Sequence, residues 1–224
     1  MKNSQNPNRA GDLPDFLWIE DEDGPPPRIR PSRDAGESSG HIPGEAGLWI
    51  FILGDMTLFG VILLVFLNDR RADRSGFRSA AAQLIQPIGA VNTLVLLLGS
   101  YLVVLAAFAH RRDRSGMARR LIAGAIGCAI AFGCLKLFEY SAEISAGNTP
   151  TVSVFFTFYF VLTGLHLLHV AIGTALLSKW LLVLRQTRPW APSSRLLEGI
   201  ASYWHMVDLL WIAIFAIVYL VSAE

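Results

Sequence analysis

Charged side chains are scarce along most of this 224-residue sequence. Asp, Glu, Lys and Arg make up only 17% of the residues, whereas 53% of the residues are hydrophobic. Most of the charges lie near the start of the chain or in short clusters between apolar runs. A soluble domain of this length needs charges spread over its whole surface, so this pattern predicts a polytopic membrane protein.

The sequence also lacks a strong net charge and a cysteine framework. The formal net charge is +1, which gives no bulk attraction to polyanions, so we expect no nucleic-acid partner. The two cysteines, Cys128 and Cys134, are six residues apart in one apolar run and point in different directions around a helix. We therefore interpret them as packing residues and not as a disulfide or a metal-binding pair.

Two regions of different composition follow one another. Residues 1–43 are polar and rich in Pro, Gly, Asp and Glu, with EDEDGPPPRIRP at their centre. Such a segment buries too little apolar surface to offset the entropy of ordering it, which predicts a disordered tail. Residues 44–224 form the predicted membrane domain.

Five apolar segments are each about long enough to cross a hydrocarbon core of about 30 Å. Since backbone groups in lipid need partners within the segment, each segment is predicted to be a helix, and the fold class is an all-α bundle of five transmembrane helices. We interpret the arginine-rich tracts between them, including 68–86, as solvated loops. The segments are 46–67, 87–109, 118–140, 152–178 and 199–222.

Most Lys and Arg residues lie in the tail, in the 110–120 connection and in the 179–195 connection, which share one side of the predicted bundle. This bias predicts a cytoplasmic N-terminus and an external C-terminus, although the 68–86 segment on the other side carries four arginines.

Five titratable residues inside the apolar segments fall at a similar depth, counted at 1.5 Å per helical residue. Intramembrane polar residues usually face the protein interior, so these five are predicted to form one polar layer that bridges the first, fourth and fifth segments. They are Asp55, His166, His169, His205 and Asp208.

Three interpretations of this layer remain open. The His-x-x-His spacing of His166 and His169 suits a metal or haem, yet too few ligands accompany it, so we expect no metal and no catalytic residue. Carboxylate–imidazole chains also carry protons, which would suit a small proton-coupled transporter or channel. The favoured interpretation is hydrogen bonding between helices, in which Asp208 accepts a hydrogen bond from a histidine of the fourth or fifth segment.

Lys136 and Glu139 lie three residues apart, on one helical face near the predicted outer end of the third segment. This spacing allows the two side chains to form an ion pair.

Several motifs together resemble the five-helix form of haem-copper oxidase subunit III, and they occur in the order of that family over about 44–222. They are GEAGLWIFILGDMTLFG (44–60), NTLVLLLGSYLVVLAAFAHRR (92–112), KLFEYSAEISAG (136–147), YFVLTGLHLLHVAIG (159–173) and YWHMVDLLWIAIFAIVYL (203–220). Within the family, the sequence looks most like the NorE-type proteins associated with nitric oxide reductase, and quinol oxidase subunit III is the near alternative.

This resemblance implies a non-catalytic accessory subunit in a bacterial inner membrane. Such subunits stabilise the catalytic subunit of a respiratory complex and support its proton uptake, and they hold no cofactor of their own but bind phospholipid between their helices. Asp55 matches the family's membrane carboxylate, which is usually the longer Glu. Glu139 and Tyr140 match its Glu-Tyr motif, which with Lys136 marks a possible lipid contact.

Overall fold

The computed structural model describes residues 46–185 and 194–223, so the predicted tail 1–43 lies outside the described residues. The described residues form helices and no strand. Five helices are long and apolar enough to cross a membrane, which confirms the predicted fold class. The elements are α1 (Ala46–Ala72), α2 (Arg74–Ala81), α3 (Gln86–Arg111), α4 (Ser115–Ser145), α5 (Val154–Arg185), α6 (Ser194–Ile214), the π-helix η2 (Phe215–Leu220) and the 3₁₀-helix η3 (Val221–Ala223).

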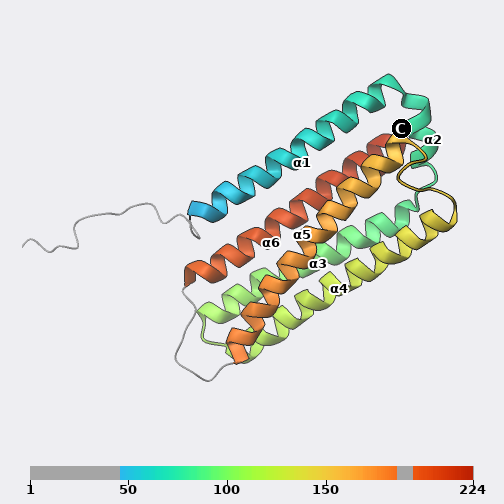
Figure 1. The fold of residues 1–224 in the computed structure, drawn as a ribbon. Coiled ribbons are helices and arrows are strands. Elements are labelled where there is room, and N and C mark those ends of the chain that lie inside the picture. The colour runs from blue at the N-terminus through green and yellow to red at the C-terminus, as the bar shows by residue number, and fades with distance from the viewer. Residues whose placement is uncertain (1–45, 186–193, 224) are drawn as a thin grey trace, which may run out of the picture. The chain divides into compact units, whose positions relative to one another are not determined.

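Successive long helices run in opposite directions (Figure 1). The α3–α4 connection, the end of α5 and the start of α6 therefore lie at the end of the bundle where α1 begins, and the α4–α5 connection and α2 lie at the other end. This is the predicted grouping of the connections, whereas the membrane side on which each group lies stays a prediction.

The observed helices extend several residues beyond most of the predicted apolar segments. Polar residues continue the helices because intrahelical hydrogen bonds satisfy their backbone groups on either side of the hydrocarbon layer. For example, α4 begins at Ser115 and ends at Ser145, while the corresponding apolar segment was 118–140.

The prediction of a solvated loop over 68–86 is wrong, because α1 reaches Ala72 and α2 follows it. Asp73 caps α2 by accepting a hydrogen bond from the Gly76 N–H at 2.9 Å. Phe77 is buried, and its ring lies 5.3 Å from that of Phe66 and 5.7 Å from that of Phe155. The short helix is therefore anchored to the bundle on one side while its arginines stay exposed.

Small residues allow close helix packing in the centre of the bundle. A Cβ atom added to Gly99 of α3 would lie 3.3 Å from Cβ of Cys128 on α4, and one added to Gly173 of α5 would lie 3.0 Å from the Trp204 ring on α6. Both cysteines are free thiols. Cys128 is half-buried against α3, which fits the packing interpretation. Cys134 is exposed in the described chain and does not fit it.

Candidate functional site

Asp55 and His169 form a side-chain contact that joins α1 to α5. The His169 Nε2 atom lies 3.2 Å from Asp55 Oδ2, and the two side chains are 7% and 13% exposed. The predicted bridge between the first and fourth apolar segments is therefore present. The Phe59 ring packs edge-on against the imidazole at 5.4 Å, which fixes the orientation of the ring.

The hydrogen-bond geometry of His169 constrains where protons sit. Its Nδ1 atom lies 2.8 Å from the Leu165 carbonyl oxygen, which only accepts, so Nδ1 must carry a hydrogen. In a neutral imidazole Nε2 is then an acceptor, and it faces a carboxylate that also accepts. The contact with Asp55 is a hydrogen bond only when one further proton lies on Nε2 or on the carboxyl group.

His166 is fully buried, but it does not join a hydrogen-bonded layer. Its ring lies 5.6 Å from Phe132 and 5.1 Å from Trp211. Neither ring nitrogen has a hydrogen-bond partner in the part of the chain that the structure describes. Among the described residues the predicted hydrogen bond of His166 is therefore not made, because the ring lies against aromatic rings and not against polar groups.

His205 and Asp208 also differ from the prediction. His205 Nδ1 lies 2.6 Å from the Ser100 hydroxyl oxygen, which joins α6 to α3. Asp208 is buried, and neither of its carboxyl oxygens has a hydrogen-bond partner within residues 46–185 and 194–223. The predicted hydrogen bond from a histidine to Asp208 is therefore absent among these residues, because His205 turns to Ser100 and His169 turns to Asp55.

Lys136 and Glu139 are both completely buried and form the predicted ion pair, with Nζ 3.1 Å from Oε2. Lys136 also donates to the hydroxyl oxygens of Tyr159 at 3.3 Å and Tyr219 at 2.9 Å. Tyr219 donates in turn to Glu139 Oε1 at 2.6 Å. All three ammonium hydrogens and both carboxylate oxygens therefore have partners. Because both side chains are completely buried, the pair lies inside the bundle and away from a lipid-facing surface.

Aromatic rings surround the Lys136 ammonium group. Its nitrogen lies between 4.8 and 5.6 Å from four ring centres, which is within the range of cation–π attraction. Three helical elements, α4, α5 and the α6–η2 segment, contribute these rings. They belong to Tyr140, Tyr159, Trp211 and Tyr219.

The π-helix η2 positions Tyr219 in this cluster. A π-helix has i→i+5 hydrogen bonds and thus more residues in each turn than an α-helix. Trp211 and Tyr219 are eight residues apart, so on a regular α-helix with 3.6 residues per turn their side chains would point in directions about 80° apart. Here their rings lie 6.4 Å from each other. Sequence periodicity alone therefore does not reveal that Tyr219 is a partner of Lys136.

Tyr140 makes a separate link between α4 and α5. Its hydroxyl group lies 2.7 Å from the Thr163 hydroxyl, which itself donates to the Tyr159 carbonyl at 2.6 Å. Tyr140 is partly exposed, in contrast to Lys136 and Glu139. Of the three residues predicted as a possible lipid contact, only Tyr140 reaches the surface of the chain.

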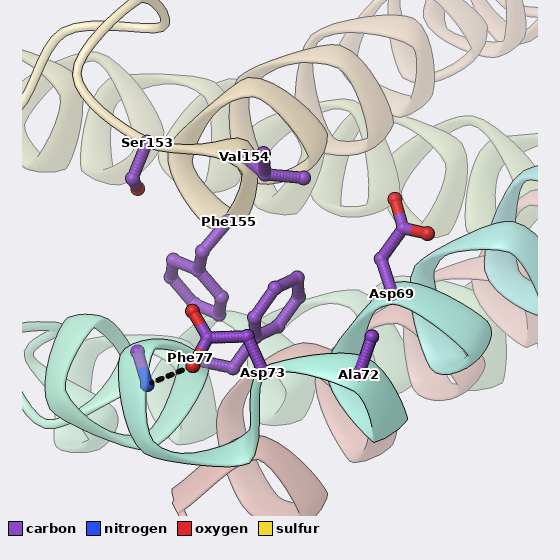
Figure 2. A pocket seen from close by; sticks show the side chains of 8 residues that line it. Asp69, Ala72, Asp73, Phe77, Ser153, Val154 and Phe155 are labelled. Atoms are coloured by element: carbon purple, nitrogen blue, oxygen red, sulfur yellow. Dashed lines mark hydrogen bonds between the residues drawn. The ribbon is translucent and has the colours of Figure 1, made fainter.

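Two grooves lie at opposite ends of the bundle. One, of about 220 Å³, lies where α1, α2 and the start of α5 meet (Figure 2), and its lining includes the carboxylates of Asp69 and Asp73. The other, of about 490 Å³, lies between α4 and α5, and Arg119, Arg120 and Arg185 line it.

No group of three or more His, Cys, Asp or Glu side chains could hold a metal ion within the described ranges. The expected absence of a metal, a cofactor and a catalytic residue stays a prediction.

Sequence reasoning missed several polar partners. Ser100, Tyr159 and Tyr219 are hydrogen-bond partners of predicted residues, and Trp211 donates to the Thr93 hydroxyl at 3.0 Å. Hydroxyl-bearing residues are common in apolar helices, so only the helix arrangement distinguishes these from the rest.

Comparison with known proteins adds evidence that is independent of this geometry. The family Cytochrome c oxidase subunit III matches residues 43–223. A probable quinol oxidase subunit 3 of Staphylococcus haemolyticus (strain JCSC1435) is 23% identical over 178 residues, covering 80% of this chain and 89% of that protein. The probable quinol oxidase subunits 3 of Staphylococcus aureus strains USA300 and COL match to the same extent. The match covers the whole five-helix bundle, and this chain therefore belongs to the cytochrome c oxidase subunit III family of haem-copper oxidase subunits.

Proposed function

We propose that this chain is a non-catalytic accessory subunit of a haem-copper oxidase complex, where it stabilises the catalytic subunit and supports proton uptake. The observation that carries the proposal is the family match over 43–223, which spans all five membrane helices of the described residues. The interior supports a scaffold role, because the buried Lys136–Glu139 pair and its tyrosines join α4, α5 and η2.

The Asp55–His169 pair supports the proton role. Its contact holds one proton between two groups that otherwise both accept, and Asp55 is partly exposed on α1. Carboxylate–imidazole pairs are among the groups that carry protons through membrane proteins. Asp55 is shorter than the family's usual Glu, yet it reaches His169.

For the partner, the curated relatives favour a quinol oxidase complex, since their names describe subunits of such an enzyme. The NorE-type resemblance keeps a nitric oxide reductase partner as the alternative. Purification of the tagged chain from native membranes tests both: a haem-bearing partner that oxidises quinol supports the first, and one that reduces nitric oxide supports the second. Recovery without any haem-bearing partner would refute the accessory role.

The proton role is tested in the purified complex reconstituted in liposomes. We expect Asp55→Asn to slow proton uptake during turnover while assembly stays intact, and Asp55→Glu to restore the rate. Asp69→Asn, which removes a carboxylate from the same helix, is the control. Equal proton uptake in Asp55→Asn and in this control would contradict the role. Proton flux through liposomes that hold this chain alone would instead favour the transporter hypothesis.

We also propose that the groove between α4 and α5 binds a phospholipid headgroup. Three arginines line it beside the apolar residues Ala123 and Leu181, which suits a phosphate and the start of an acyl chain. Native mass spectrometry of the purified chain is expected to show bound anionic phospholipid, which Arg119→Gln with Arg185→Gln removes. Unchanged lipid retention in that double variant would exclude this groove.

A further inference from the structure

A third groove lies between α3 and α6, two helices that pack against each other (Figure 1). It has a volume of about 190 Å³. The residues that α3 contributes to it are spaced i, i+3, i+4 and i+7, which places them in one stripe along the helix, and α6 contributes a pair spaced i, i+4. The lining residues are Val104, Ala107, Phe108 and Arg111 of α3, with Ala201 and His205 of α6.

The shape of this surface suits a further helix. Two helical stripes with a hollow between them are the arrangement into which the side-chain ridge of another helix packs. Ala107 and Ala201 keep the hollow open, and small residues at a membrane helix interface allow a close approach. The surface continues along both helices, because Tyr101 and Leu209, each about one turn beyond the groove, are both 59% exposed.

His205 is the residue that sets this surface apart from a plain lipid-facing one. It lies nine residues after Leu196, where the spanning part of α6 begins, and therefore about 14 Å along that helix at 1.5 Å per residue. His166 and His169 are buried, whereas His205 is half-buried and lines the groove. Hydrocarbon offers no hydrogen-bond partner, so polar side chains at such a depth usually face other protein groups.

The hydrogen bonding of His205 defines what a partner must supply. Its Nδ1 atom lies 2.6 Å from the Ser100 hydroxyl oxygen, and within residues 46–185 and 194–223 its Nε2 atom has no partner. In a neutral imidazole, Nε2 donates if Ser100 donates to Nδ1, and it accepts if Nδ1 carries the hydrogen. A hydroxyl or carboxamide group matches either state, because it both donates and accepts.

We propose that the α3–α6 groove is the docking surface for a transmembrane helix of the haem-bearing catalytic subunit, which places a hydroxyl or carboxamide side chain against His205 Nε2. This inference rests on the proposed accessory function and adds where the partner binds. The Arg111–Glu198 ion pair, at 3.0 Å, forms the polar border of the surface where α3 ends and α6 begins. The outer face of α4, by contrast, presents apolar residues such as Ile130 and Leu137, which lipid chains solvate.

The surface is tested by photocrosslinking in native membranes. A photoreactive amino acid is placed at Val104 or Leu209 on the proposed surface and, as the control, at Ile130, which is 58% exposed on α4. We expect a covalent product with the haem-bearing subunit from Val104 and Leu209 but not from Ile130. A product from Ile130 alone, a product with a second copy of this chain, or no protein product while the haem-bearing subunit still co-purifies would each overturn the proposed surface.

The contact at His205 is tested by the dissociation constant of the purified complex, measured from the haem retained per tagged chain on serial dilution. We expect His205→Leu to raise this constant about three- to thirtyfold, the effect of one interhelical hydrogen bond in a membrane, and His205→Gln to restore it. An unchanged constant in His205→Leu overturns the contact.

The groove itself is tested by filling it. Ala107→Leu is expected to raise the dissociation constant about tenfold or more by overpacking the contact, whereas Ala131→Leu, the same change on the exposed face of α4, is expected to leave it unchanged. Equal constants in these two variants overturn the proposal, even if His205→Leu fails to fold. A complex that forms through another surface refutes this inference alone, whereas the absence of any haem-bearing partner refutes the proposed function with it.

Discussion

Replacement of Lys136 by methionine removes the positive charge from the most enclosed ion pair among the described residues. Methionine has nearly the same length, so packing changes little. Glu139 then keeps only the Tyr219 hydroxyl, 2.6 Å from Oε1, and loses the ammonium group at 3.1 Å from Oε2. Both residues are 0% exposed, so no lipid headgroup or bulk water replaces the lost partner.

Loss of one partner from a buried ion pair costs about 3–5 kcal/mol, because the other charge stays buried without compensation. The double variant Lys136→Met/Glu139→Gln removes both charges, and we expect it to recover most of this loss, since apolar or neutral replacement of a whole pair is often nearly neutral. The difference between the single and double variants is the measurement that isolates the charge effect.

The assay is reversible unfolding of the purified chain in mixed micelles with increasing SDS, followed by tryptophan fluorescence. Lys179→Met is the control, because Lys179 is an exposed lysine on α5, and we expect it to change stability by less than about 0.5 kcal/mol. A loss below about 1 kcal/mol in Lys136→Met, no larger than that of an ordinary hydrogen bond, would refute the argument that the lysine compensates the buried Glu139 side chain.

Three further predictions use the same unfolding assay. Gly89→Leu is expected to cost about 1–3 kcal/mol, because a Cβ atom there would already lie 2.9 Å from the Phe215 ring, whereas Gly127→Leu, with open space around it, is expected to be tolerated. Phe77→Ala is expected to cost about 3–5 kcal/mol by emptying the aromatic contact that anchors α2; retained stability, with unchanged protease resistance of α2, would contradict this anchoring. His166→Phe is expected to be neutral or stabilising, because it replaces a buried ring without hydrogen bonds by an apolar one, and a clear loss of stability would point to a partner of the imidazole.

Hydropathy was sufficient to predict the five spanning helices, because length and apolar composition decide whether a helix crosses the bilayer. It did not predict α2, since Arg74 and Arg78 give that segment the composition of a loop. The burial of Phe77 depends on rings that α1 and α5 supply, and the local sequence does not contain that information.

The candidate site shows a similar division. The Lys136–Glu139 pair was predictable because both residues lie on one helix at a spacing that brings them together. The partners of His205 and Asp208 were not, because depth along a helix says nothing about its rotation toward its neighbours. Tyr219 was hidden for a further reason, since a π-helix changes the direction in which later residues point.

The Lys136–Glu139 pair also has a consequence for biosynthesis. Both charges lie on α4 and compensate each other within a single helical turn, so this helix enters the bilayer without a net charge at that depth. Tyr159 and Tyr219 belong to elements that are synthesised later, and their hydroxyl groups complete the cluster only when α5 and η2 arrive. Within α4 alone, the two opposite charges already compensate each other in the bilayer. The hydrogen bonds that join α4 to α5 and η2 form only after those later helices have been synthesised.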